Sequence, residues 1–154
     1  MSKVSFRHAF ARWYDMMENE RARMDNRQKS GEASLSWEAL DHICGLAVES
    51  GMKALMFKAN MVKPDPSGDY PADQDGRRPH VDALWDIFLA KASERTASEW
   101  VRTLNGGKGT PVHVFQAWRA EHRYAPDDTV AEKTVQSRLQ MAKRLKKIAE
   151  EEGL

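Results

Sequence analysis

The most informative part of the sequence is HICGLAVESGMKALMF, which spans residues 42–57. Read as an α-helix, this stretch carries apolar or small side chains around nearly its whole circumference, whereas an ordinary surface helix has one apolar stripe. The residues that cover it, with one neighbour before it, are Leu40, Ile43, Cys44, Leu46, Ala47, Val48, Gly51, Met52, Ala54, Leu55, Met56 and Phe57. Because such a helix must be surrounded by other elements, we expect it to be the central helix of an all-α bundle.

Two charged residues interrupt this apolar helix. Glu49 and Lys53 are one helical turn apart, in the order that favours an ion pair. One interpretation is a partly exposed charge pair that keeps one edge of the helix in contact with water. The other is a polar groove wall that meets a ligand or a residue from elsewhere in the chain. His80 is a candidate for that residue, since it stands at the start of the next predicted helix; alternatively, it is a helix-start residue with no functional role.

The remaining sequence predicts an up-and-down helical bundle of four long helices plus one short helix. The long helices are expected over about 5–28, from a cap at Ser34 or Ser36 to about 61, over 80–104 with a break or kink near 93–97, and after a capping box at 129–132. The short helix is expected to begin at residues 110–111 and to end before Pro126. One side of the last helix is predicted to be exposed and basic, with Lys133, Arg138, Lys143, Arg144, Lys146 and Lys147.

Residues 63–79 have no helical periodicity. They contain four prolines, two glycines and four aspartates, so they predict a long mobile loop inside a single domain of 154 residues. Loops of this length in a compact domain are commonly functional or disordered.

Composition excludes several broad classes. With 24 basic and 23 acidic residues, any nucleic-acid-binding surface must be local. The single cysteine, Cys44, lies on the predicted buried helix, so it is expected to be inert and no disulfide can form within the chain. The sequence predicts no metal site, no cofactor and no membrane segment. A signal peptide is not expected either, which predicts a cytoplasmic protein.

The densest group of polar residues with chemical potential is Trp118-Arg119-Ala120-Glu121-His122-Arg123-Tyr124. On a helix, Arg119, His122 and Arg123 would lie within one turn, where two guanidinium groups could hold a phosphate and an imidazole could act as a general acid or base. Alternatively, the arginines pair with carboxylates and His122 is an ordinary surface residue.

Three phrases of the sequence resemble those of HEPN-domain proteins. The segment Gly45–Met56 is similar to the second-helix pattern of that family, in which L-A-x-E-x-x-x-K-x-L is common. His80-Val81-Asp82-Ala83-Leu84 looks like the His-x-x-x-Leu phrase that often opens the third helix after a variable loop. Trp118 with Arg123-Tyr124 is similar to the aromatic and Arg-Tyr phrase before the final helix. The phrases occur in the family's order and span roughly residues 35–152.

The resemblance implies a homodimeric helical bundle from a prokaryotic toxin–antitoxin, phage-defence or stress system that binds RNA or a nucleotide, or cleaves RNA. Family nucleases carry an arginine, four to six further residues and then a histidine, and none of the five histidines here follows an arginine at that distance. The resemblance therefore favours a non-nuclease that binds RNA or a nucleotide near Glu49, Lys53, His80, Arg123 and Tyr124. The alternatives are a metal-independent endoribonuclease with Arg119 and His122 as catalytic residues, and a structural module that binds a partner protein.

Overall fold

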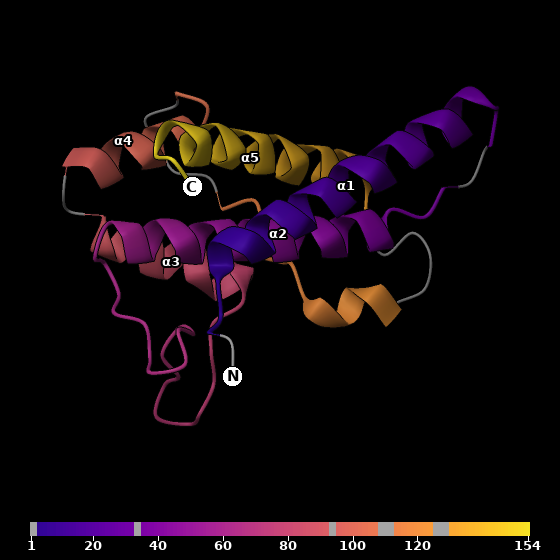
Figure 1. Cartoon of the computed structure of the whole chain (residues 1–154). Coiled ribbons are helices and arrows are strands. Elements are labelled where there is room, and N and C mark those ends of the chain that lie inside the picture. Colours follow the sequence, from indigo (N-terminus) through magenta and orange to yellow (C-terminus); the bar gives the residue numbers. More distant parts are fainter. Residues whose placement is uncertain (1–2, 33–34, 93–94, 108–112, 125–129) are drawn as a thin grey trace.

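A computed structural model describes residues 3–32, 35–92, 95–107, 113–124 and 130–154 of the chain. Its elements, in chain order, are α1 (Phe6–Lys29), α2 (Glu38–Lys58), α3 (Val81–Lys91), α4 (Arg95–Leu104), the 3-10 helix η1 (Ala120–Tyr124) and α5 (Glu132–Glu151). The described residues form no strand, so the predicted all-α bundle is confirmed. Figure 1 shows α1 crossing α2, α5 lying beside α2, and α3 on the opposite side of α2 from α5.

The centre of the bundle is α2, as its sequence predicts. Its fully buried apolar side chains cover one half of the helix, and the apolar side chains on the other half, Ile43, Leu46 and Phe57, are half-buried. The fully buried residues are Leu40, Cys44, Ala47, Val48, Met52, Leu55 and Met56. Burial raises the pKa of the Cys44 thiol far above its ordinary value. The thiolate that would make this cysteine reactive is therefore not formed near neutral pH.

Two glycines bring neighbouring elements close to α2. A Cβ atom at Gly45 would lie 2.2 Å from the Trp118 ring, and one at Gly51 would lie 2.7 Å from Leu145 Cδ2. The glycines therefore set how closely the segment before η1 and the middle of α5 approach the central helix. Outside these contacts, α1 packs on α2 through Phe10, Met17 and Met24, which recur at intervals of seven residues.

The short helix predicted to begin at residues 110–111 differs in the structure. Residues 114–117 form turns and only Ala120–Tyr124 are helical, as a 3-10 helix. The predicted start of this helix lies outside the described residues. Thr129 of the predicted capping box also lies outside them, and α5 begins two residues later than that box implies, with Ala131 at its N-cap and no side-chain cap bond.

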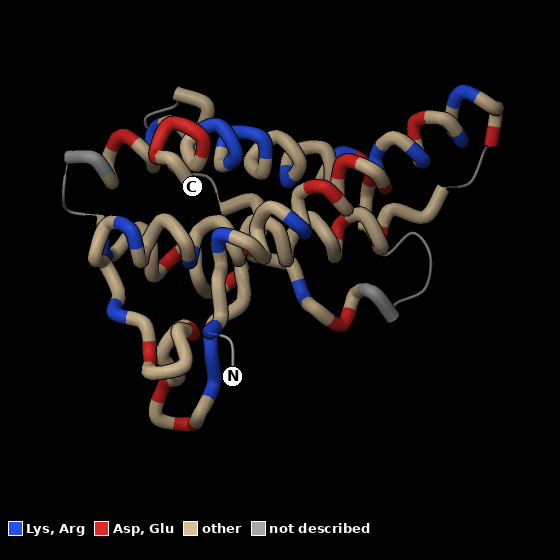
Figure 2. The backbone as a smooth tube through the Cα atoms, in the orientation of Figure 1, with Lys and Arg blue, Asp and Glu red and all other residues tan. Residues whose placement is uncertain are grey.

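The predicted basic side of α5 needs one correction. Arg138 is not exposed: only 3% of it is accessible, and its guanidinium binds Asp41 of α2. Lys133 and Lys147 are exposed, and Lys143, Arg144 and Lys146 are half-buried. Figure 2 shows Lys and Arg recurring along α5, so a reduced basic face remains. Among the described residues, no helix combines the length and the apolar character needed to cross a membrane.

The segment between α2 and α3 is held by its own polar contacts. The Asp65 carboxylate accepts hydrogen bonds from the Ser67 amide at 2.8 Å and the Asp69 amide at 3.0 Å. The Arg78 guanidinium donates to Asp65 Oδ2 at 3.0 Å, and the Val4 amide donates to the Ser67 carbonyl at 3.0 Å. Mobility of this loop stays a prediction, since these contacts describe its conformation and not its motion.

A pH titration tests the Asp65 contacts. The Ser67 hydroxyl and the Arg78 guanidinium lower the pKa of the Asp65 carboxyl to about 2, from an ordinary value of 3.8. Because the folded-state pKa is depressed, the contacts contribute fully above pH 3.8 and are lost as the pH falls through about 2. We expect the NMR amide signals of Ser67 and Asp69 to titrate with a midpoint of about 2. The Asp65→Asn variant should lack this transition, and a midpoint of 3.8 in the parent would contradict the prediction.

Candidate functional site

Glu49 and Lys53 form an enclosed ion pair on α2. Lys53 Nζ lies 3.3 Å from Glu49 Oε2, and only 5% of the lysine side chain and 13% of the glutamate side chain are exposed. The ammonium also lies 5.2 Å from the centroid of the Phe6 ring and 5.5 Å from that of Tyr70. This arrangement shields Lys53 from solvent more completely than the partly exposed pair expected from the sequence. Lys53 is therefore shielded from solvent, and a direct contact between it and a ligand stays a prediction.

The second oxygen of Glu49 holds His80 at the surface. His80 Nδ1 lies 2.9 Å from Glu49 Oε1, and 60% of the histidine side chain is exposed. In the neutral imidazole, the proton must be on Nδ1 for this bond to form, because a carboxylate can only accept. The other ring nitrogen, Nε2, is then an acceptor. The structure thus brings Glu49, Lys53 and His80 together, with the imidazole as the exposed member.

Arg119 contacts the first turn of α3 through Asp82. Its Nη1 donates to Asp82 Oδ2 at 3.2 Å, and to the carbonyl oxygens of Trp118 at 2.8 Å and Gln116 at 3.1 Å. Asp82 is two residues beyond His80, which is the N-cap residue of α3. With 53% of its side chain exposed, Arg119 retains donors that face solvent.

His122 occupies a different environment from Arg119. The two residues are joined by a backbone hydrogen bond from the His122 amide to the Arg119 carbonyl at 3.2 Å. His122 Nδ1 is buried and has no hydrogen-bond partner among the described residues, and the imidazole interacts electrostatically with Asp41 of α2. The described contacts direct Arg119 to α3 and His122 to α2, so a catalytic role for the two together stays a prediction. The side chains of Arg123 and Tyr124 lie outside the described residues.

The buried ion pair between Asp41 of α2 and Arg138 of α5 was not identified from the sequence. Asp41 is fully buried, and Arg138 Nη1 contacts both of its carboxylate oxygens, at 2.8 and 2.9 Å. Burial raises the pKa of Asp41, and the hydrogen bonds from Arg138 oppose that rise. Trp118 Nε1 donates to the Asp41 carbonyl at 3.1 Å, which fixes the segment that carries Arg119. An acidic residue on an otherwise apolar helix was the available signal, since a buried carboxylate requires a cationic partner.

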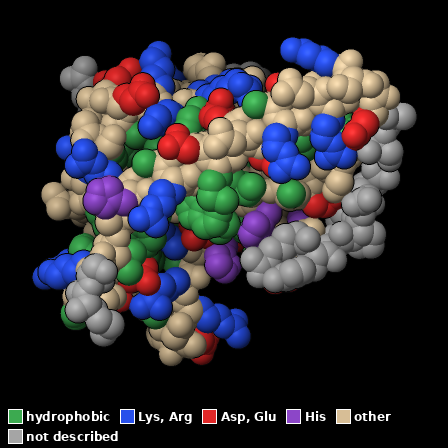
Figure 3. All heavy atoms as spheres, turned by 45° about the vertical axis from the view of Figure 1, so that its right-hand side comes forward, with side chains coloured by type: hydrophobic (Ala, Val, Ile, Leu, Met, Phe, Trp, Pro, Cys, Tyr) green, Lys and Arg blue, Asp and Glu red, His purple; other side chains and the backbone are tan. Residues whose placement is uncertain are grey.

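The surface features that a ligand can use are a group of histidine side chains and the cavities between helices. Figure 3 shows histidine side chains gathered near the middle of one face, beside hydrophobic side chains and below Lys and Arg side chains. A groove of about 400 Å³ between the start of α1 and the end of α2 is lined by Phe6, Phe57, Arg7 and Lys58, among others. A smaller pocket lies between α4 and α5. The described residues contain no group of three or more metal-ligating side chains.

No protein-family model, no curated protein and no solved structure gives a significant match to this chain.

Proposed function

We propose that this chain is a non-nuclease, HEPN-like helical bundle that binds the phosphate of RNA or of a nucleotide at the N-terminal end of α3. The observation that carries the proposal is that two exposed side chains, His80 and Arg119, are each fixed by a carboxylate at the first turn of that helix. His80 is held there by Glu49 at 2.9 Å, and Arg119 is held on Asp82 at 3.2 Å.

The dipole of α3 favours an anion at this helix end, and the charge of Asp82, the acidic residue of the first turn, is balanced by Arg119. The first N–H groups of a helix have no partner within the helix, and the helix dipole places about half a positive charge there. Lys53 neutralises Glu49, so the carboxylate that orients His80 does not repel an incoming phosphate as an isolated charge would. Arg119 adds a planar guanidinium that suits phosphate oxygens. The HEPN-like phrases support the proposal because Glu49, Lys53 and His80 all belong to them.

The second candidate is a metal-independent endoribonuclease, and the His80 geometry favours it independently. An imidazole whose Nδ1 is bonded to a carboxylate presents Nε2 as an acceptor, which is the arrangement a general base needs. In this version His80 takes the proton, whereas the sequence suggested Arg119 and His122 as the catalytic pair. The third candidate, a module that binds a partner protein, needs neither side chain. The resemblance also implies a homodimer, which analytical ultracentrifugation tests.

Binding of a fluorescein-labelled single-stranded RNA and of a labelled mononucleotide tests the proposal. In the proposed phosphate-bound form His80 is the imidazolium, whose Nδ1–H bonds Glu49 and whose Nε2–H donates to a phosphate oxygen. We expect His80→Ala and Arg119→Ala each to weaken binding by about tenfold or more, because a charge-assisted hydrogen bond contributes about 1.5–3 kcal/mol. For RNA, each loss should also reduce the salt slope by about 0.7. Stability should change by less than about 0.5 kcal/mol, since both side chains are more than half exposed.

Arg23→Ala is the matched control. Arg23 is an exposed arginine on α1 that pairs with Glu20 at 3.2 Å, as Arg119 pairs with Asp82. Equal affinity in all variants, or no binding by the parent at low salt, would exclude the proposal and leave the protein-interaction module. RNA cleavage by the parent that is lost in His80→Ala and kept in Arg23→Ala would establish the nuclease instead. Loss in Arg119→Ala and His122→Ala alone would assign catalysis to that pair.

A further inference from the structure

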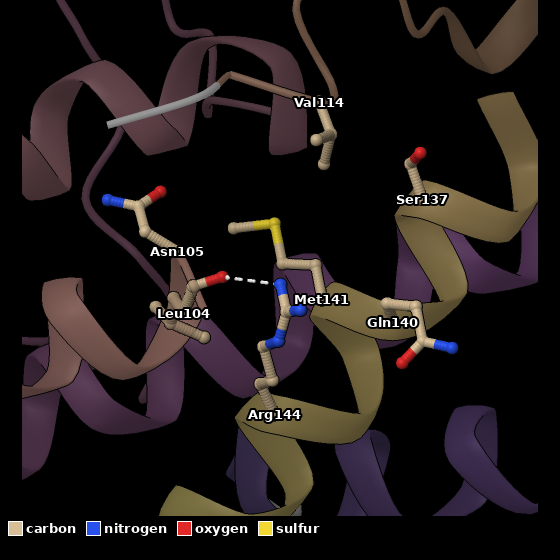
Figure 4. A pocket seen from close by; sticks show the side chains of 7 residues that line it. All are labelled: Leu104, Asn105, Val114, Ser137, Gln140, Met141 and Arg144. Carbon is tan, nitrogen blue, oxygen red and sulfur yellow. Dashed lines mark hydrogen bonds between the residues drawn. The ribbon is translucent and has the colours of Figure 1, made fainter. Parts of the chain in front are cut away.

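A pocket lies on the opposite side of α2 from α3, where α4 meets α5. The pocket there has a volume of about 230 Å³. Four of its residues recur on α5 at the spacing of a single helix face, and the end of α4 and the segment before η1 close it (Figure 4). The lining residues are Leu104, Asn105, Val114, Ser137, Gln140, Met141 and Arg144. None of them belongs to the His80 surface.

The charged member of the pocket is Arg144, which contacts no carboxylate in the part of the chain that the structure describes. Arg144 Nη1 donates to the Leu104 carbonyl at 3.3 Å, a long bond, and none of the described residues forms an ion pair with it. A Cβ atom at Gly106 would lie 2.8 Å from Arg144 Nη2, so the guanidinium lies against the backbone of that glycine. Of the five N–H donors of an arginine, most therefore remain for another acceptor.

The other lining groups complement an anion that carries a short chain. The Ser137 hydroxyl donates to the Lys133 carbonyl at 3.2 Å, so its oxygen is left to accept a hydrogen bond. Gln140 is exposed and offers an amide at the rim. Met141 and Leu104 are buried and Val114 is half-buried, which gives the pocket apolar walls (Figure 4).

We propose that this pocket binds a small organic oxyanion, with Arg144 holding the anionic group and Ser137 accepting from a hydroxyl on the attached chain. Carboxylate and phosphate share the planar, two-oxygen edge that a guanidinium binds bidentately. The volume is below the 300–1,000 Å³ typical of pockets for drug-sized ligands and equals the liquid volume of about eight waters. The ligand is therefore a molecule of a few carbons and not a dinucleotide or a peptide.

Amide-resolved NMR titrations with inorganic phosphate, glycerol phosphate and glycerate test this site. We expect a saturable shift of the Asn105, Ser137 and Arg144 amide signals with at least one of the organic probes. Tighter binding of glycerol phosphate would identify a phosphate ester as the ligand, and tighter binding of glycerate a carboxylate. Inorganic phosphate should bind more weakly than the better organic probe, because it has no attached chain to reach Ser137 from Arg144 or to pack on the apolar walls.

Two variants remove the site in different ways, and a third is the control. Arg144→Gln removes the charge, and Ser137→Leu fills the mouth of the pocket with a helix-compatible side chain and leaves the charge unchanged. Each should raise the dissociation constant by about tenfold or more. Lys147→Gln makes the same charge change on an exposed position of α5 and should leave it within about twofold. The proposal is wrong if no organic probe binds at about 10 mM, or if all three variants behave alike.

Discussion

Replacing Arg138 by methionine is expected to lower the free energy of unfolding by about 3–5 kcal/mol, because it leaves a buried carboxylate without its partner. Asp41 is fully buried, and both of its oxygens accept from Arg138 Nη1. Methionine fills a similar volume, so the loss reports the missing charge more than a cavity. The change also removes the bond from Arg138 Nε to the Val114 carbonyl, 2.8 Å long. Urea unfolding with linear extrapolation measures the loss.

Two further proteins separate the ion pair from a general effect of removing a charge from α5. Lys147→Met makes the same kind of change at an exposed position and should alter stability by less than about 0.5 kcal/mol. The double variant Asp41→Leu with Arg138→Met should recover most of the loss, since a buried pair replaced by apolar side chains is often close to neutral. A loss in Arg138→Met no larger than that in Lys147→Met would show that the buried pair contributes nothing to stability.

Arg138 was wrongly assigned to the exposed side of α5, and this error shows which kind of contact the sequence could not predict. Helical periodicity placed α1 to within one residue at each end and identified α2 as the central helix, because both depend on local patterns of apolar residues. The partner of Arg138 is 97 residues earlier in the chain, and no local pattern joins the two. An arginine on a helix rich in lysines was therefore assigned to the solvent side, although it lies between the apolar positions Val135 and Ala142.

The contacts of the candidate site also fall into two groups: those that a local sequence pattern predicts and those that join distant parts of the chain. The Glu49–Lys53 pair follows from a spacing of four on one helix, and its approach to His80 was a reasonable inference because a loop returns the chain beside α2. The contact between Arg119 and Asp82 spans 37 residues and depends on turns and a 3-10 helix where the sequence predicted an α-helix. The pocket at Arg144 needs three segments to meet, so no single stretch of sequence indicates it.

Replacing Gly45 by alanine is expected to lower the free energy of unfolding by about 1–3 kcal/mol, the cost of inserting a methyl group into a filled core. In an ordinary helix the same change raises stability by about 1 kcal/mol, so the predicted effect has the opposite sign. The cause is Trp118: the added Cβ atom would lie 2.2–2.4 Å from three atoms of its indole. The ring is fully buried and is bonded through Nε1 to the Asp41 carbonyl, so it has little freedom to move away.

Two comparisons identify the Trp118 ring as the cause, each measured by urea unfolding. In a Trp118→Leu background, adding Gly45→Ala should cost little or should stabilise by up to about 1 kcal/mol, because the colliding ring is gone and the helix propensity of alanine remains. Gly51→Ala should cost less than Gly45→Ala, since its closest neighbour is the end of the flexible Leu145 side chain. A penalty for Gly45→Ala that persisted in the Trp118→Leu background would place its origin in α2 itself. It would then exclude close packing of the segment before η1 as the reason for a glycine at this position.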